Sequence, residues 1–136
     1  MKISTKGRYA LRAMISLAKS GGSGNVKSIS EQECLSAKYL EAIFSSLSRS
    51  KLVKGKRGPD GGYVLVKNAK QINCFDILSA MGDELVIADC VKEKVQKCKR
   101  RTTCPTRPVW KKLDAMVTSF LKDVSLADLS GAKVWK

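Results

Sequence analysis

The feature that most constrains the fold is the segment of residues 37–50, AKYLEAIFSSLSRS. Apolar side chains recur in it at steps of three and four residues, which predicts an α-helix with one narrow buried face: Leu40, Ile43, Phe44 and Leu47. Ser36 comes directly before the segment and is predicted to be the helix N-cap. The opposite face is polar and free to contact another molecule: Lys38, Glu41, Ser45 and Arg49.

Two earlier patterns place this helix in a larger unit. Residues 6–19 repeat apolar positions at helical spacing, and Gly21 and Gly22 are expected to end that helix. Residues 28–31, SISE, have the spacing of a capping box and predict a second, short helix that begins there and ends near Cys34. A short helix, a tight turn and a helix with one polar face together predict a helix-turn-helix.

A predicted β-hairpin follows directly. Residues 52–66, LVKGKRGPDGGYVLV, contain two β-prone runs around a Gly-Pro-Asp-Gly-Gly turn. A hairpin at this place forms the wing of a winged helix-turn-helix. Lys54, Lys56 and Arg57 lie near its tip, where they would reach DNA phosphates or a minor groove. The same charges also suit the solvated edge of an ordinary hairpin.

The net charge indicates the class of partner. The chain carries 26 Lys and Arg residues against 12 Asp and Glu residues, a formal net charge of +14. Such a surplus indicates a polyanion, either nucleic acid or an anionic membrane face. No stretch approaches the roughly 20 apolar residues of a membrane span, so we expect a cytoplasmic protein with no membrane partner. Aromatic residues are only 6% of the chain, which disfavours RNA recognition by stacking and favours double-stranded DNA.

Three cysteines lie in the basic segment of residues 90–104, CVKEKVQKCKRRTTC: Cys90, Cys98 and Cys104. In a reducing compartment this grouping favours metal or redox chemistry over a structural disulfide. The neighbouring basic residues, Lys97 among them, would lower the thiol pKa values and offset the charge of ligating thiolates. Zinc, a thiol–disulfide switch and the absence of any cofactor remain open. Cys34 and Cys74 lie apart and are predicted to be small buried apolar residues.

The C-terminal part is predicted to be helical again. Asn73 is expected to cap a short helix that Gly82 ends. From about Pro108 a long amphipathic helix carries a broad apolar stripe: Trp110, Leu113, Met116, Val117, Phe120, Leu121 and Val124. We expect this stripe to pack against a second subunit, and folding back on its own domain is the alternative.

The predicted fold class is mainly α with a small β-wing. It comprises a winged helix-turn-helix DNA-binding domain at 1–83, a cysteine-containing loop at 84–106, and a long dimerisation helix with a C-terminal tail at 107–136. The chain has no CxxC pair, no histidine and no substrate-pocket motif. We therefore do not expect an enzyme or a small-molecule substrate.

Three stretches, MKISTKGRYALRAM, YLEAIFSSLSRSKLV and RGPDGGYVL, closely resemble the Rrf-type winged-helix transcription regulators. The resemblance implies a homodimer whose long C-terminal helices cross, with two winged heads on a partly palindromic operator. Ser36, Lys38, Tyr39 and Glu41 fall where the family contacts DNA, and Arg57 would enter the minor groove. A glutamate at the position of Glu41 helps the apo form of family members reject one class of operator, although Glu41 also suits a solvated helix position.

Three cysteines ahead of a long helix resemble the iron–sulfur cluster regulators of this family. Those proteins hold a 2Fe–2S cluster with the cysteines and a histidine three residues after the last one. The matching position here is Arg107, whose guanidinium offers no free lone pair. The fourth ligand is therefore open: Asp89, Glu93, a small thiol or water. A 4Fe–4S cluster on the three thiolates is also allowed, and an aerobically prepared sample can lack any cluster.

The predicted function is a homodimeric DNA-binding transcriptional regulator, acting as a repressor or a dual regulator. It would sense iron–sulfur cluster, iron or redox status through a labile cluster on Cys90, Cys98 and Cys104. The alternative is a cofactor-free, zinc-controlled or disulfide-controlled regulator of the same family, acting in sulfur or cysteine metabolism.

Overall fold

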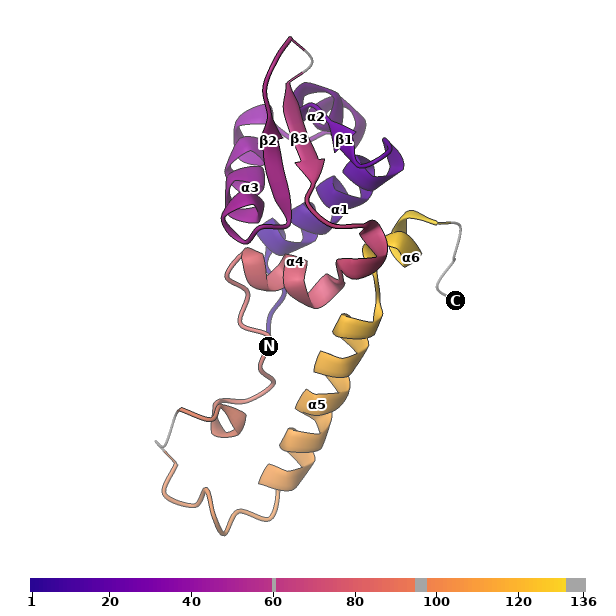
Figure 1. Cartoon of the computed structure of the whole chain (residues 1–136). Coiled ribbons are helices and arrows are strands. Elements are labelled where there is room, and N and C mark those ends of the chain that lie inside the picture. The colour runs from indigo at the N-terminus through magenta and orange to yellow at the C-terminus, as the bar shows by residue number, and fades with distance from the viewer. Residues whose placement is uncertain (60, 95–97, 132–136) are drawn as a thin grey trace.

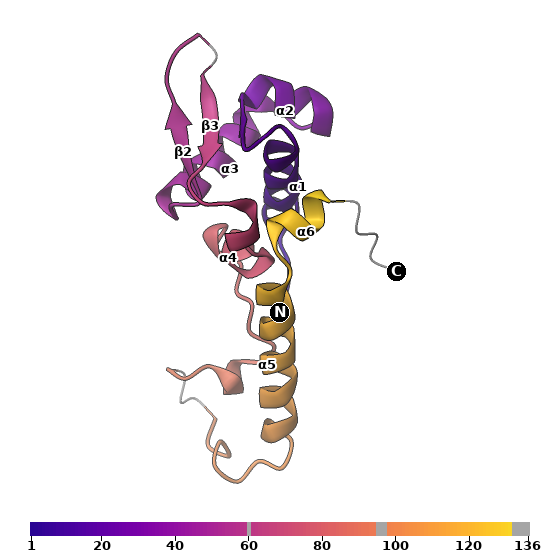
Figure 2. The same ribbon diagram turned by 45° about the vertical axis from the view of Figure 1, so that its right-hand side comes forward.

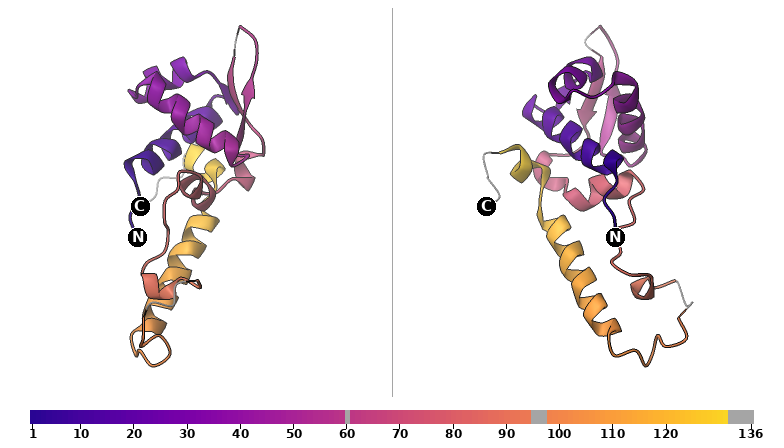
Figure 3. Two further views of the ribbon diagram at one scale, coloured as in Figure 1. Left: turned by 90° about the vertical axis from the view of Figure 1, so that its left-hand side faces the viewer. Right: turned by 180° about the vertical axis from the view of Figure 1, so that it is seen from behind.

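The computed structural model describes residues 1–59, 61–94 and 98–131. A winged head forms one end of the molecule, and a long helix, α5 (Arg107–Asp123), extends away from it toward the loop that contains the cysteines (Figure 1). The side and rear views show the same extended arrangement (Figure 3). None of the helices in the described ranges combines the length and the apolar character that crossing a bilayer requires.

The head contains three helices and a small sheet. Its elements are α1 (Thr5–Lys19), β1 (Ser23–Gly24), α2 (Val26–Glu33), α3 (Ala37–Arg49), β2 (Val53–Lys56) and β3 (Gly62–Leu65). The three strands are antiparallel in the order β1-β3-β2. The hairpin of β2 and β3 protrudes beyond the helices as a wing (Figure 2). This architecture confirms the predicted winged helix-turn-helix.

The rest of the described chain is helical or irregular. Its elements are η1 (Ala69–Gln71), α4 (Cys74–Ala80), η2 (Asp89–Val91), α5 (Arg107–Asp123) and α6 (Leu126–Ser130). Asn73 caps α4 as predicted, because its side chain accepts the backbone N–H of Asp76 at 2.9 Å. Gly82, with φ +79°, provides the left-handed conformation that ends this segment.

The hydrophobic core lies between the helices of the head and the wing. The predicted stripe of α3 is completely buried: Leu40, Ile43, Phe44 and Leu47. It meets Met14 and Leu17 of α1, which are equally buried. The periodicity of the sequence therefore identified the packing faces of both helices.

Helix α2 begins earlier than predicted. The sequence pattern placed its start at residues 28–31, but it begins at Val26 with Asn25 as the N-cap. The Asn25 side chain accepts the backbone N–H of Ser28 at 2.7 Å, and Val26 is buried in the core. Burial of Val26 and a strong Asx cap therefore prevail over the capping-box spacing.

The two cysteines outside the basic segment differ from each other. Cys74 is buried, as predicted. The prediction of a buried Cys34 is wrong, because this residue is exposed. Cys34 is the C-cap of α2 with φ 55° and ψ 42°, and this left-handed turn directs its side chain outward.

The chain beyond α5 returns to the head. Leu126 is fully buried in the core, and Val124 is 5% exposed. The Leu126 N–H donates to the carbonyl of Ile72 at 2.7 Å, and the Cys74 N–H donates to the carbonyl of Val124 at 3.0 Å. Helix α6 packs against α1. The end of α5 is thereby fixed to the head.

Candidate nucleic-acid interface and cysteine loop

The N-terminus of α3 presents the four residues predicted to contact DNA. The Ser36 hydroxyl accepts the backbone N–H of Tyr39 at 3.1 Å, which makes Ser36 the N-cap. Ser36, Lys38 and Glu41 are exposed. Tyr39 is half-buried, and its ring packs edge-on against Tyr9 of α1 at 5.8 Å between centroids. One helix end thus offers a hydroxyl, an ammonium, a phenol and a carboxylate to an outside molecule.

The wing presents the second group of predicted contacts. Lys54 and Lys56 lie two residues apart on β2, so they share one face of the strand, and Arg57 follows at its end. All three are exposed. Opposite Lys56 lies Gly62, where a Cβ atom would overlap the carbonyl oxygen of Gly24. Glycine is therefore required for the wing to pass this close to β1.

A side-chain contact that the sequence did not indicate joins the wing to α3. The Tyr63 hydroxyl on β3 donates to the Glu41 carboxylate at 3.1 Å. The Tyr63 ring stacks on Phe44, with 4.7 Å between centroids and 11° between planes. Burial raises the pKa of Tyr63, and the hydrogen bond and negative charge of Glu41 raise it further.

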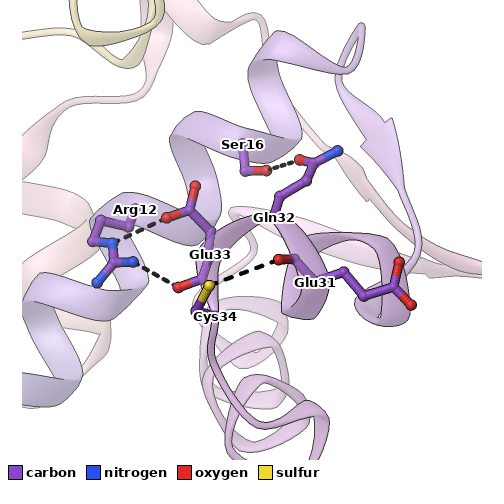
Figure 4. A network of polar contacts seen from close by, with 6 residues as sticks. All are labelled: Arg12, Ser16, Glu31, Gln32, Glu33 and Cys34. Atoms are coloured by element: carbon purple, nitrogen blue, oxygen red, sulfur yellow. Dashed lines mark hydrogen bonds and ion pairs between the residues drawn. The ribbon is translucent and has the colours of Figure 1, made fainter.

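A polar network fixes the turn that leads into α3 (Figure 4). The Arg12 guanidinium of α1 donates to the Glu33 carboxylate at 3.0 Å and to the Glu33 carbonyl at 2.7 Å. The Ser16 hydroxyl donates to the Gln32 side chain at 2.7 Å. These bonds hold the end of α2 against α1, so they orient the helix-turn-helix, although Arg12 itself is exposed.

The three predicted ligand cysteines occupy one loop at the far end of the molecule. Cys90 lies on η2, and Cys98 is exposed. The Cys104 thiol lies 3.2 Å from the Thr106 hydroxyl, immediately before α5. That hydroxyl and the backbone N–H groups of Thr106 and Arg107 hold the pKa of the Cys104 thiol below its ordinary value. These contacts therefore favour the thiolate form of Cys104 relative to an isolated cysteine.

Arg107, at the position where a histidine ligand was considered, makes a structural contact instead. Its Nε–H donates to the carbonyl of Cys90 at 3.0 Å, which joins the start of α5 to η2. Asp89, one candidate for a fourth ligand, forms an ion pair with Lys92 at 2.7 Å. Lys92 also pairs with Glu84, and these two partners raise the pKa of its ammonium group. Glu93, the other carboxylate candidate, is exposed.

The donor chemistry of the loop fits a soft metal centre, but the described residues do not assemble one. Within residues 1–59, 61–94 and 98–131, no three Cys, Asp, Glu or His side chains converge closely enough to hold a metal ion. Three thiols nevertheless suit iron–sulfur or zinc ligation. The basic surroundings would offset their charge, although Lys97 lies outside the described residues.

Helix α5 leaves most of its predicted apolar stripe uncovered. Four residues of that stripe are exposed: Trp110 (38%), Leu113 (39%), Met116 (61%) and Phe120 (56%). Val109, outside the predicted stripe, is also exposed (58%). At its C-terminal end Val124 is buried in the head, and Lys122 lies 4.9 Å from the Phe75 ring centroid. Nearer the loop, Asp114 accepts the Ile87 N–H at 2.9 Å. One side of α5 is thus fixed within the chain, and its apolar side faces outward.

Comparison with known proteins agrees with this architecture. The Rrf2 family, described as an iron-dependent transcriptional regulator, matches residues 3–132. The HTH-type transcriptional regulator IscR of Cronobacter sakazakii is 37% identical over 131 residues, which are 95% of this chain and 80% of that protein. The matched family and this relative are transcriptional regulators rather than enzymes, as the sequence predicted.

Solved structures give the same result. CymR (YrzC), the global cysteine regulator of B. subtilis, superposes with a TM-score of 0.80 at 34% identity, covering 98% of this chain and 99% of that one. IscR of T. potens superposes with a TM-score of 0.70 at 32% identity, covering 95% and 85%. The chain therefore belongs to the Rrf2 family of winged-helix transcriptional regulators.

Proposed function

We propose that this regulator is a cytoplasmic homodimer that binds double-stranded DNA with the polar face of α3 and the wing. Ser36, Lys38, Tyr39 and Glu41 would lie in the major groove, where hydroxyl, ammonium and carboxylate groups contact phosphates or base edges. The exposure of Ser36, Lys38 and Glu41 at one helix end, beside an exposed basic wing, supports this assignment.

The wing would add two kinds of contact. Lys54 and Lys56 project from one strand face and would neutralise phosphates. Arg57 would enter the minor groove, where its guanidinium is attracted by the negative potential of a narrow A·T-rich segment. These contacts position the head, while the α3 residues supply sequence preference.

We further propose that Cys90, Cys98 and Cys104 hold a labile iron–sulfur cluster, with 2Fe–2S favoured over 4Fe–4S. Such a cluster would supply an oxidation-sensitive and iron-dependent cross-link between the three thiolates. The position of Cys104 immediately before α5 carries the proposal, because ordering this loop would act directly on that helix. The description of the matched family as iron-dependent also supports it.

The apolar side of α5 would form the dimer interface. Five large apolar side chains exposed on one helix indicate an interaction surface. Because α6 fixes the end of α5 to the head, a change at the cysteine loop would alter how the two heads are spaced. Regulation then requires only that the protein with a cluster on this loop and the protein without it differ in their affinity for DNA.

A second candidate is a regulator of the same family that uses no iron–sulfur cluster. The close superposition on the global cysteine regulator of B. subtilis favours it, together with Arg107 in place of a ligand. In this version the thiols would bind zinc, form a disulfide or have no regulatory role.

One experiment separates the two candidates. The protein is purified without oxygen, and its iron, acid-labile sulfide, zinc and visible absorption are measured. DNA sites selected by this protein are then tested with the wild type and with a variant carrying Cys90→Ser, Cys98→Ser and Cys104→Ser. The first candidate predicts iron and sulfide in matching amounts and a changed operator affinity in the variant.

The possible results are distinct. A protein without iron or sulfide that also fails chemical reconstitution would leave the second candidate. Equal binding of every selected site by variant and wild type would contradict regulation through these cysteines. Failure of the wild type to prefer any DNA sequence would contradict the proposed function as a whole.

A further inference from the structure

We infer that Tyr63 is a positioning residue for operator discrimination: its hydroxyl fixes the direction of the Glu41 carboxylate on α3. The inference rests on the proposed function, since it requires that Glu41 faces DNA. The two side chains come from different elements, β3 and α3, and their hydroxyl–carboxylate distance is 3.1 Å. A residue of the wing strand β3 thereby sets the direction of a side chain on α3.

The tyrosine ring is held firmly enough to serve this purpose. It lies on the central strand of the sheet, opposite Gly24 of β1 and Gly55 of β2. Its stacking partner Phe44 is fully buried. Packing therefore fixes the ring and with it the position of the phenolic oxygen.

Glu41 by itself has no comparable constraint. It is exposed on the helix surface, where a glutamate side chain populates several rotamers. Tyr63 supplies a donor on one side, and the hollow beside it, about 380 Å³ in volume, is lined by Asn25, Lys27, Glu41, Gly55 and Tyr63 among others. A hydrogen bond to a charged acceptor selects the rotamer that faces the wing.

The direction of this carboxylate matters because it is an acidic group beside the basic residues of α3 and the wing. Held in one place, it can accept from a cytosine amino group and repel a phosphate or a guanine edge. Released, it can turn toward solvent and the repulsion weakens. Loss of the Tyr63 hydroxyl should therefore relax the choice between operators and leave binding to random DNA unchanged.

The test compares full-length wild type with Tyr63→Phe, Glu41→Gln and the double variant. Tyr63→Phe retains the ring that stacks on Phe44 and removes only the hydroxyl. Each protein, in the same cofactor state, selects sites from a randomised duplex pool, and its affinities for the best and the disfavoured sites are measured. Tyr9→Phe is the matched control, because it removes a hydroxyl elsewhere in the head.

We expect Tyr63→Phe to lower the ratio of the two affinities about threefold to tenfold, in the same direction as Glu41→Gln. The double variant should equal Glu41→Gln, since the Tyr63 hydroxyl acts only by directing a negative charge that the glutamine lacks. Tyr9→Phe should retain the wild-type preference. Titration of the tyrosines by NMR should also show a lower Tyr63 pKa in Glu41→Gln than in the wild type, because a raising interaction is removed.

Failures of the two proposals can be distinguished. If Tyr63→Phe keeps the wild-type ratio of affinities for the two sites while Glu41→Gln changes it, Tyr63 does not position Glu41. The proposed function would be unaffected by that result. An unchanged affinity ratio in Glu41→Gln would also overturn the positioning role, because Glu41 would then not discriminate between operator sites. If the wild type itself selects no site, the proposed function fails, and the inference fails with it.

Discussion

At the scale of single residues, Arg107 most directly limits the chemistry of the cysteine loop. It cannot ligate iron, and it donates instead to the carbonyl of Cys90. We predict that Arg107→His, which adds an imidazole ligand at this position, lengthens the lifetime of a reconstituted iron–sulfur cluster in air severalfold. The decay of visible absorption after exposure to oxygen measures this.

The control for that substitution is Arg107→Gln, which removes the charge and keeps an N–H donor for Cys90 without adding a metal ligand. The glutamine variant should lose its cluster as fast as the wild type. Equal decay in the histidine and glutamine variants would show that position 107 lies outside the coordination sphere.

At the scale of elements, the exposed side of α5 is the strongest sign of an interface. Met116 is 61% exposed at the middle of this apolar face. We predict that Met116→Glu reduces the molar mass in solution from that of two 14.9 kDa chains to that of one, because a buried unpaired carboxylate disfavours association. Light scattering during size-exclusion chromatography gives the mass.

Ala115→Glu is the matched control for the interface. It adds the same charge on the neighbouring exposed position of α5, about 100° around the helix from Met116. This variant should keep the mass of the wild type. A single-chain mass for the wild type itself would contradict the dimer.

Helix α6 shows how the end of α5 is joined to the head. Leu126 is fully buried in the core of the head, although it lies beyond α5 in the chain. Replacing it by alanine leaves a cavity, so we predict that Leu126→Ala lowers the free energy of unfolding by about 2–5 kcal/mol. Chemical denaturation measures this, and Leu129→Ala on the same helix, at a half-buried position, should have a smaller effect.

At the scale of the whole molecule, the net charge of +14 and the basic wing determine how binding responds to salt. Each neutralised phosphate contributes about 0.9 to the slope of log affinity against log salt concentration. We predict that Lys54→Ala and Lys56→Ala together, which remove two lysines from each wing of the dimer, reduce the magnitude of this slope by roughly 4. Fluorescence anisotropy at several salt concentrations provides the measurement.

Lys70→Ala provides the comparison, because Lys70 is an exposed lysine on η1, at the base of the head. Its loss should leave the slope nearly unchanged. If all three lysines lower the slope equally, the affinity arises from diffuse charge and the wing has no special contact with phosphates.

Much of the fold could be predicted from the sequence because it depends on neighbours within one helical turn. The stripe of α3 and the caps at Ser36 and Asn73 appear in the structure as the patterns predicted. The start of α2 was misplaced, because burial of Val26 determines it rather than the capping motif alone. The outward side chain of Cys34 also depends on a backbone conformation that composition does not specify.

The contacts that connect the elements could not be predicted in the same way. Tyr63 is hydrogen-bonded to Glu41, 22 residues away in the sequence, and Arg12 to Glu33, 21 residues away. No local period or spacing relates such pairs, because their distance depends on how the helices and the sheet pack. Likewise, the sequence identified three cysteines ahead of an amphipathic helix, while only the folded chain joins Arg107 to Cys90.

By itself, the sequence determined the winged helix-turn-helix, the basic character of the wing and the family, since local periodicity, caps and charge are properties of short segments. The tertiary structure alone determined that α6 returns to the core, that α5 keeps its apolar side exposed and that the wing holds Glu41. Those features arise from packing between distant segments, where shape and burial, rather than spacing along the chain, decide which side chains meet.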